Sequence, residues 1–258
     1  MPESIVKISD QYTFVLLRGL ARETKHWGQF ETALSESNFC KKIILCDLPG
    51  MGIYHKSSAP SSINKIVSFL KKNHHRTFQK EENLFLLGLS LGGMVAFEYL
   101  RQNPKLFEKA AIINSSFRGL SPIYERVRPP ALLKLLKIMA EKEPSKREEK
   151  ILPLISNFHT DDQEVLQHYI EICTKRPVKI SNVISQLVAA SRYQFSLNTP
   201  IQTKGLVLCS REDRLVNVRC SHALGKALGW PVSEHSLAGH DLPLDAPEWI
   251  LEEISKFI

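Results

Sequence analysis

The feature that most constrains the fold is a regular alternation of short apolar runs with helix-like segments. The runs are brief and apolar on both faces, as expected of parallel strands that helices cover on both sides. The predicted strands are Thr13–Leu17, Lys42–Cys46, Asn83–Leu87, Ala110–Asn114, Gly205–Cys209 and Val232–Leu237. The predicted helices are Ser61–Asn73, Leu91–Asn103, Val218–Leu228 and Pro247–Ile258. This order predicts the α/β class, with a mostly parallel, doubly wound sheet.

The alternation stops between residues 117 and 203, where the sequence becomes helical and amphipathic. The expected helices of this segment are Leu132–Met139, Gln163–Lys175 and Val178–Arg192. Prolines such as Pro153 are expected between helices. An insertion of about 80 residues is too long for a loop without structure of its own. We therefore expect a core of residues 1–116 and 204–258 and a helical cap, residues 117–203, over the carboxyl edge of the sheet.

Composition and charge exclude several classes of protein. Of the 258 residues, 43% are hydrophobic and 24% are charged, which excludes disorder, collagen and coiled coil. The formal net charge is +7, and in the cap basic residues alternate with acidic ones, as in Glu141-Lys142-Glu143. This pattern is typical of solvated helix faces, although a basic cap can also attract an acidic carrier or an anionic substrate. No basic stripe interleaved with aromatic residues is present, so we expect no nucleic-acid partner.

Cysteines and apolar stretches bear on location. The five cysteines are odd in number and include no CxxC pair, which favours a reduced, cytoplasmic compartment and predicts neither a metal nor a cofactor. The first residues, MPESIVKISDQYTF, contain acids and no basic-then-apolar block, so we expect no secretory signal. The longest apolar stretch, Leu84–Phe97, is interrupted by Ser90 and three glycines and is too short to span a bilayer.

The strongest motif is Gly88-Leu-Ser90-Leu-Gly92, between a predicted strand and a predicted helix. A serine with glycine at both second neighbours in this context is typical of a nucleophile elbow. The turn is so tight that side chains at positions 88 and 92 would collide with the strand or the helix, and glycine removes the collision. Ser90 then stands at the positive end of the following helix. We predict Ser90 as a nucleophile, with an inert serine in a tight turn as the alternative.

A nucleophilic serine needs a general base, and His240 is the best candidate among nine histidines. It lies in Gly239-His240-Asp241, directly after the last predicted strand, and Ser90 also follows a strand. Because the loops at the carboxyl ends of parallel strands share one edge of the sheet, the two side chains are expected to meet there. The alternatives that stay open are His26, His159 and His168.

The third group should be a carboxylate that fixes the imidazole tautomer and stabilises the imidazolium. Asp213 follows the strand that ends at Cys209 and is therefore expected at the same edge. Its neighbour Glu212 is a less favoured alternative. Asp241 is adjacent to His240 in sequence but cannot easily reach back to its ring.

Stabilising the oxyanion that forms during acyl transfer needs two backbone N–H groups. One should come from Leu91, directly after the predicted nucleophile. The other should come from the loop after the first strand, Leu17-Arg18-Gly19-Leu20, and we assign it to Leu20.

Several motifs occur together in residues 12–116 and 204–258. They are Arg18-Gly19, Asp47-Leu-Pro-Gly50-Met-Gly52, Gly88-Leu-Ser90-Leu-Gly92-Gly93, Asp213 and Gly239-His240. In this order and spacing the chain resembles the α/β-hydrolase superfamily, whose triad runs Ser, Asp, His along the chain. The core looks most like small bacterial carboxylesterases of the pimeloyl-carrier-protein methyl ester esterase type. The resemblance implies Ser90 as nucleophile, His240 as base and Asp213 as its orienting acid, with Leu20 and Leu91 supplying the N–H pair.

Three features depart from the pattern of that superfamily. Arg18 stands where the family usually has a histidine before the glycine of the oxyanion loop. The family's Asp-x-Pro-Gly-x-Gly-x-Ser ends in Tyr54 instead of serine. Only about eleven residues precede the first strand, so we expect the antiparallel strands that usually open the sheet to be shortened or missing.

These residues predict a serine hydrolase that cleaves a carboxylic ester or thioester of a small acyl substrate, free or carrier-linked, through an acyl-enzyme on Ser90. The same triad can instead serve a carbon–carbon lyase or hydrolase, such as the menaquinone-pathway synthase that the core also resembles. Arg18 and the basic cap are the candidates for binding a substrate carboxylate there. A third alternative is a fold retained for ligand binding without catalysis. Neither substrate identity nor oligomeric state follows from the sequence.

Overall fold

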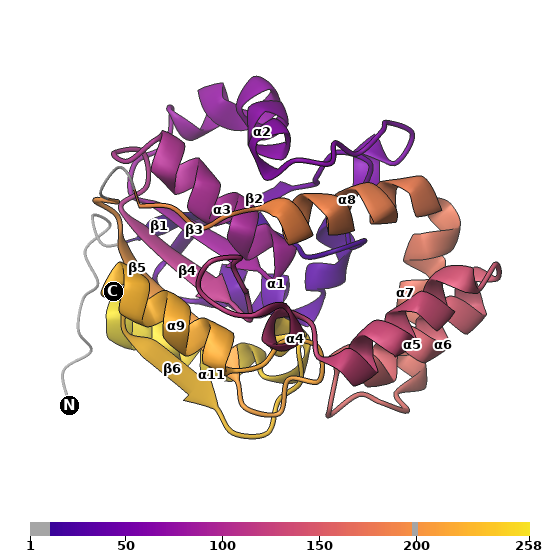
Figure 1. Cartoon of the computed structure of the whole chain (residues 1–258). Helices are drawn as coiled ribbons and strands as arrows, with labels where there is room; N and C mark the ends of the chain where they lie inside the picture. The colour runs from indigo at the N-terminus through magenta and orange to yellow at the C-terminus, as the bar shows by residue number, and fades with distance from the viewer. Residues whose placement is uncertain (1–10, 198–200) are drawn as a thin grey trace.

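The computed structural model describes residues 11–197 and 201–258, and a six-stranded sheet lies at its centre (Figure 1). The strands are β1 (Tyr12–Leu17), β2 (Cys40–Cys46), β3 (Leu84–Leu89), β4 (Lys109–Ile113), β5 (Lys204–Ser210) and β6 (Val232–His235). They lie in the order β2-β1-β3-β4-β5-β6, and every neighbouring pair is parallel. The central strands β1, β3 and β4 are buried along their whole length, which explains why their sequences are apolar without alternation.

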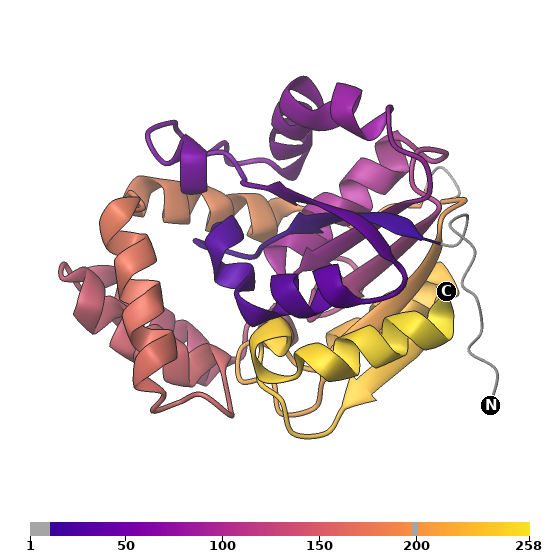
Figure 2. The same cartoon turned by 180° about the vertical axis from the view of Figure 1, so that it is seen from behind.

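Helices cover both faces of this sheet (Figures 1 and 2). One face packs against α2 (Ile63–Phe78), α3 (Leu91–Gln102) and α9 (Arg219–Leu228), and the other against α1 (Gln29–Glu36), α10 (Leu242–Asp245) and α11 (Pro247–Phe257). Alternate strand residues supply the two apolar layers, since Val15 faces the first set of helices and Phe14 the second. The predicted fold class is therefore confirmed.

Between β4 and β5 the chain is mainly helical. The helices are α4 (Ile123–Arg126), α5 (Pro129–Ala140), α6 (Pro144–Ile155), α7 (Gln163–Lys175) and α8 (Ile180–Arg192). Figure 1 shows α5, α6 and α7 beside the sheet, with α8 leading back toward it. The predicted helical insertion is thus present, whereas its separation as a cap domain at residues 117–203 stays a prediction.

Some local predictions were wrong. Pro153 lies inside α6, in its last turn, instead of separating two helices. Pro153 has no N–H to donate to the residue four positions before it, so α6 lacks one hydrogen bond in its last turn and ends two residues later. The helix α1 was not predicted, since its eight residues are too few for a clear periodic pattern. The strand β6 ends at His235, and Leu237, which was expected in that strand, lies exposed in the following loop.

The sheet order brings two loops together. The order reverses at β1, because β2 lies on one side of it and β3 on the other. At such a reversal the two loops run to opposite faces and open a crevice at the carboxyl edge, where open α/β sheets bind ligands. The first of these loops follows β1 and contains Leu20 and the short 3₁₀ helix η2 (Thr24–Trp27). The second loop follows β3 and begins with Ser90. A second 3₁₀ helix, η3 (Gly52–Tyr54), follows β2.

The sheet begins at β1, and no antiparallel strand joins it within the described residues. This agrees with the expected shortening, although residues 1–10 lie outside the described residues. In the same described ranges, none of the helices combines the length and the apolar character that crossing a membrane requires.

Candidate active site

Ser90 occupies the tight turn between β3 and α3. Its backbone has φ 56° and ψ −117°, a conformation that costs a residue with a side chain about 1–3 kcal/mol. The N–H of Ser90 donates to the Ile113 carbonyl at 2.8 Å, and Ser115 Oγ donates to the Ser90 carbonyl at 2.8 Å. These bonds hold the strained turn against β4 and the residues that follow it.

The glycines around Ser90 are explained by close approach of backbone. A Cβ atom at Gly92 would collide with the carbonyl oxygens of Leu17 and Arg18. A Cβ atom at Gly88 would lie 2.5 Å from the Gly92 carbonyl oxygen. The collisions expected at both positions are therefore present, and they involve backbone atoms that cannot move aside as a side chain can.

Asp213 and His240 are brought together from two different strand ends. His240 Nδ1 lies 2.7 Å from Asp213 Oδ2, and both side chains are buried. The other oxygen, Asp213 Oδ1, accepts hydrogen bonds from the N–H groups of Leu215 and Val216 at 2.7 and 2.9 Å. The carboxylate is thus held at both oxygens and favours the imidazole tautomer with its proton on Nδ1. Glu212, the alternative acid, is exposed instead.

The surroundings of His240 raise its pKa. Burial lowers the pKa of His240, but the charge and the hydrogen bond of Asp213 raise it more, and the charge of Asp241 adds to them. The pKa therefore lies above the ordinary 6.5. This environment stabilises the imidazolium, which is the state that a general base reaches after it takes a proton.

Two further side chains hold the loop of His240. Asn114, directly after β4, donates from Nδ2 to the His240 carbonyl at 2.8 Å and accepts the N–H of the last residue of β5 at 2.9 Å. Asp245 Oδ2 accepts the N–H of Gly239 at 2.6 Å. Asn114 directly follows Ile113, whose carbonyl accepts the N–H of Ser90. The end of β4 therefore holds both the turn of Ser90 and the loop of His240.

Ser90 and His240 lie at the same edge of the sheet without a hydrogen bond between them. Among the described residues, Ser90 Oγ has no hydrogen-bond partner. Because His240 Nδ1 is engaged with Asp213, Nε2 is the ring nitrogen left to take a proton from the serine. Catalytic hydrogen bonds are often long in the free enzyme and tighten when substrate binds. The structure joins the predicted base to the predicted acid, and the contact between base and nucleophile stays a prediction.

Leu20 and Leu91 carry unpaired backbone N–H groups. Neither N–H donates a hydrogen bond to another residue in the part of the chain that the structure describes. Leu91 is the first residue of α3, so its N–H belongs to the positive end of that helix. A Cβ atom at Gly19 would lie 3.3 Å from Ser90 Cβ, which puts the loop of Leu20 against the serine. Free N–H groups on the two loops that flank a hydroxyl suit oxyanion stabilisation.

Arg18 is buried, and its side chain is paired within the protein. Nη1 and Nη2 donate to Asp241 Oδ1 and Oδ2 at 3.0 and 2.5 Å, and the guanidinium lies over the Trp27 ring, 4.8 Å from its centre. Only 2% of Arg18 is exposed. A bidentate arginine–carboxylate pair fixes geometry as well as charge, which indicates that Arg18 ties the loop of Leu20 to the histidine loop. The substrate contact predicted for Arg18 stays a prediction.

Helices between β4 and β5 reach the loop of Leu20 through polar contacts. Arg22 forms a buried ion pair with Glu148 of α6 at 2.8 Å. The N–H of Ala21 donates to Gln186 Oε1 of α8 at 3.0 Å. Helices α6 and α8 are therefore attached next to Leu20, the predicted oxyanion donor.

Sequence reasoning missed the residues that support the predicted site. They are Asn114, Asp241, Asp245 and Gln186. Asn114 carried a weak signal, because it is a polar residue that ends an otherwise apolar strand. The partnership of Arg18 with Asp241 carried none, because 223 positions separate the two residues.

Comparisons with known proteins identify the family of this chain. The family model described as serine aminopeptidase, S33, matches residues 11–238. The putative carbamate hydrolase RutD of Serratia proteamaculans (strain 568) is 24% identical over 168 residues, which are 64% of this chain. That match spans 61% of the relative, or about three fifths of its length.

Solved structures share the fold. A putative lipase from Acinetobacter baumannii AYE has a TM-score of 0.75 at 22% identity, over 96% of this chain and 83% of that one. The esterase RhEst1 from Rhodococcus sp. ECU1013 has a TM-score of 0.76 at 18% identity, over 96% and 90%. The 2-hydroxy-6-oxo-6-phenylhexa-2,4-dienoate hydrolase from Rhodococcus sp. strain RHA1 has a TM-score of 0.75 at 22% identity, over 96% of this chain and 90% of that one. Because the family model covers most of the chain, the protein belongs to the serine aminopeptidase S33 family of α/β-hydrolases.

Proposed function

We propose that the protein is a serine hydrolase that cleaves a carboxylic ester or thioester of a small acyl substrate through an acyl-enzyme on Ser90. The observation that carries the proposal is the hydrogen bond of 2.7 Å between His240 Nδ1 and Asp213 Oδ2, at the edge where Ser90 stands in a strained strand–helix turn. An oriented imidazole beside a strained serine is the arrangement that activates a hydroxyl as a nucleophile.

The reaction has two halves. Ser90 Oγ attacks the acyl carbon while His240 Nε2 takes the hydroxyl proton, and the resulting imidazolium then gives that proton to the leaving alcohol or thiol. In the second half, water attacks the acyl-enzyme, His240 takes a proton from it, and the acid leaves as Ser90 regains its own proton. Asp213 keeps its charge throughout and stabilises the imidazolium in both halves.

The tetrahedral intermediates carry a negative charge on the former carbonyl oxygen. In the proposal this oxygen binds the N–H groups of Leu20 and Leu91, which have no other partner among the described residues. Arg18 then acts as a positioning residue for the loop of Leu20. The acyl group lies under the cap, and a carrier-linked substrate is included in this proposal.

The relatives support an ester-type reaction in general terms. Their names are putative lipase, esterase and putative carbamate hydrolase. The bonds cleaved by such enzymes share an acyl carbon bonded to a heteroatom, which is the group that an activated serine attacks. Identities of 24% or less carry no information on chain length or leaving group, so the substrate class rests on the site itself.

The direct test is labelling with a fluorophosphonate probe. We expect stoichiometric labelling of folded protein, with the label on Ser90, and its loss in Ser90→Ala. Ser68→Ala is the matched control, because Ser68 is an exposed serine on α2 whose hydroxyl bonds only to its own helix. Folded protein that stays unlabelled, or label that persists in Ser90→Ala, contradicts the proposal.

The carbon–carbon alternative is separated by mass spectrometry. A serine hydrolase incubated with para-nitrophenyl esters of increasing chain length should show the acyl mass on the peptide of Ser90 during turnover. A lyase that uses the triad only to move protons shows no such adduct with any ester it turns over. The same ester series identifies the preferred acyl length.

A further inference from the structure

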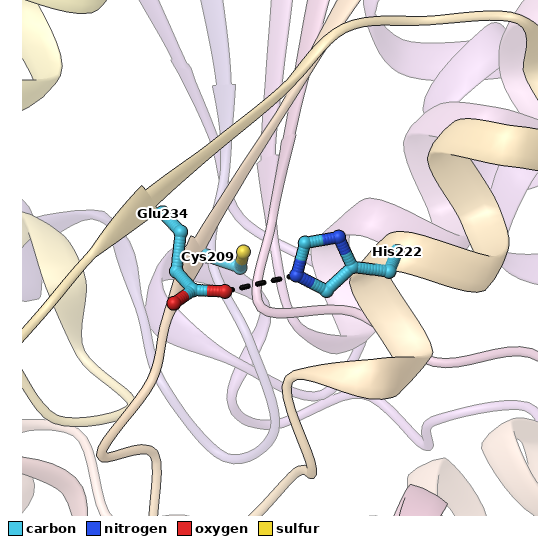
Figure 3. Close-up of side chains that lie close together, drawn as sticks. All are labelled: Cys209, His222 and Glu234. Atoms are coloured by element: carbon cyan, nitrogen blue, oxygen red, sulfur yellow. Dashed lines mark hydrogen bonds and ion pairs between the residues drawn. The ribbon is translucent and has the colours of Figure 1, made fainter.

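A second cluster of reactive side chains lies outside the candidate active site, at the edge of the sheet (Figure 3). It consists of Cys209 from β5, His222 from α9 and Glu234 from the edge strand β6. One donor atom of each side chain, a sulfur, an imidazole nitrogen and a carboxylate oxygen, lies within 4.8 Å of the other two. Cys209 and Glu234 are partners in the parallel register, so their side chains share the face of the sheet that α9 covers.

The histidine and the glutamate already face each other. His222 Nε2 lies 2.9 Å from Glu234 Oε2 and is hydrogen-bonded to it. The other oxygen, Glu234 Oε1, accepts a hydrogen bond from Arg211 Nε at 2.6 Å. The hydrogen bond from Arg211 to Oε1 orients the carboxylate, so that Oε2 stays directed at His222. Residues that surround a metal site orient its ligands by hydrogen bonds of the same kind. A cation can therefore take the place of the proton between Nε2 and Oε2.

We propose that Cys209, His222 and Glu234 form a binding site for a divalent transition-metal ion, of which Zn²⁺ fits best. Thiolate, imidazole and carboxylate are the three ligand types of protein zinc sites, with bonds of about 2.3, 2.1 and 2.1 Å. A tetrahedral site of that size spaces its ligand atoms by about 3.3–3.8 Å. The nitrogen and the carboxylate oxygen, which are 2.9 Å apart, then move slightly apart, and the sulfur already lies within 4.8 Å of both. Mg²⁺ and Ca²⁺ prefer oxygen ligands, so the thiolate disfavours them.

Access and proton balance are compatible with this site. The side chain of His222 is 52% exposed, whereas Cys209 is buried, so an ion enters from solvent and a water molecule completes four ligands. Burial and the charge of Glu234 raise the pKa of the Cys209 thiol to about 12, so the charge of the bound ion has to drive the release of that proton to solvent. Binding also requires the His222 tautomer with its proton on Nδ1.

A bound ion would tie the last strand of the sheet to its neighbours. β6 has four residues and pairs with β5 alone among the described strands. The chain after β6 carries His240, and the chain after β5 carries Asp213. Because the ion binds the folded chain, it stabilises that chain by an amount that rises with the logarithm of the ion concentration above Kd. The site is independent of the hydrolase chemistry at Ser90.

The test uses the full-length protein and the metal ion alone. Co²⁺ replaces Zn²⁺ in such sites, and a cobalt–thiolate bond gives a charge-transfer band in the near ultraviolet. We expect this band at about one Co²⁺ per chain, its removal by added Zn²⁺, and no effect of Mg²⁺. Cys209→Ser should abolish the band, and Cys220→Ser should keep it, because Cys220 is a buried cysteine of α9 outside the cluster.

Affinity and stability provide the second readout. In competition with a chromophoric chelator, His222→Ala and Glu234→Gln should bind Zn²⁺ roughly tenfold or more weakly than wild type. Zn²⁺ should raise the melting temperature of the wild type more than that of these variants. Folded wild type without the cobalt band, or a band that persists in Cys209→Ser, overturns the proposal. If Cys209→Ser fails to fold, unchanged Zn²⁺ affinity in folded His222→Ala, altered only at a half-exposed side chain, overturns it equally.

Discussion

Arg18 and Asp241 form a buried ion pair in which two guanidinium nitrogens donate to the two carboxylate oxygens, at 3.0 and 2.5 Å. Arg18 lies two residues before Leu20, the proposed oxyanion donor, and Asp241 directly follows His240, the proposed base. The pair therefore fixes the position of the loop of Leu20 relative to His240. A bidentate geometry constrains orientation as well as distance, which a lysine in the same place would not do.

Asp241→Asn should lower the free energy of unfolding by about 3–5 kcal/mol, because it leaves Arg18 buried without a counter-charge. Urea unfolding followed by circular dichroism measures this loss. Lys256→Ala is the control, because its ion pair with Glu253 is exposed and its removal should leave the unfolding midpoint unchanged. The double variant R18M/D241L should recover most of the stability, since apolar side chains can replace a buried pair. Equal unfolding midpoints for wild type and Asp241→Asn would contradict this account.

Ser90→Gly and Ser90→Ala should differ in stability although both lose ester hydrolysis. Ser90 has φ 56°, which glycine adopts without strain and alanine does not. We expect Ser90→Gly to be more stable than Ser90→Ala by about 1 kcal/mol in urea unfolding. If the alanine variant is the more stable of the two, the strain assigned to this turn is absent in solution.

The pH dependence of ester hydrolysis should follow the protonation of His240. The pKa of His240 lies above 6.5, and protonated histidine cannot take the proton of Ser90, so kcat/KM should fall as the pH drops through a value above 6.5. Asp213→Asn should reduce kcat by roughly three to four orders of magnitude and move the acid limb to lower pH. Glu212→Gln, which changes the exposed residue next to Asp213, should leave kcat and the position of the acid limb unchanged. An acid limb that stays in place in Asp213→Asn speaks against the pairing of Asp213 with His240.

Acid should destabilise the protein through His26. Burial lowers the pKa of His26 well below 6.5, and the charges of Arg22 and Arg18 lower it further. The unfolded chain, with the ordinary pKa, binds the proton first, so the stability that neutral His26 contributes is complete above pH 6.5 and is lost as the pH falls below it. The slope reaches about 1.4 kcal/mol per pH unit for one group.

His240 does not obscure this effect. Its pKa is raised by folding, so its contribution is complete below pH 6.5 and is lost as the pH rises through the folded value. Urea unfolding of wild type and His26→Gln at pH 7 and pH 5 isolates the difference, and the variant should lose less stability between them. Parallel losses in the two proteins would show that His26 does not titrate as described.

The sequence alone determined the class of fold and which residues are the candidates for the active site. Each central strand is a continuous apolar run because it is buried on both faces, and the Gly88-Leu-Ser90-Leu-Gly92 motif reports a local steric requirement. Such signals are visible because their cause lies within a few residues of the chain. The helices α1 and α6 were not predicted, because α1 has only eight residues and α6 contains Pro153.

Only the tertiary structure decided which of these groups meet. It paired Asp213 rather than its neighbour Glu212 with His240. The carboxylate of Asp213 is the one that accepts hydrogen bonds from the N–H groups of the residues two and three positions later, and these bonds orient it toward His240. It also paired the buried Arg18 with Asp241, a contact that the sequence did not predict. Contacts between residues far apart in the chain depend on strand order and loop packing, and no local pattern of residues encodes them.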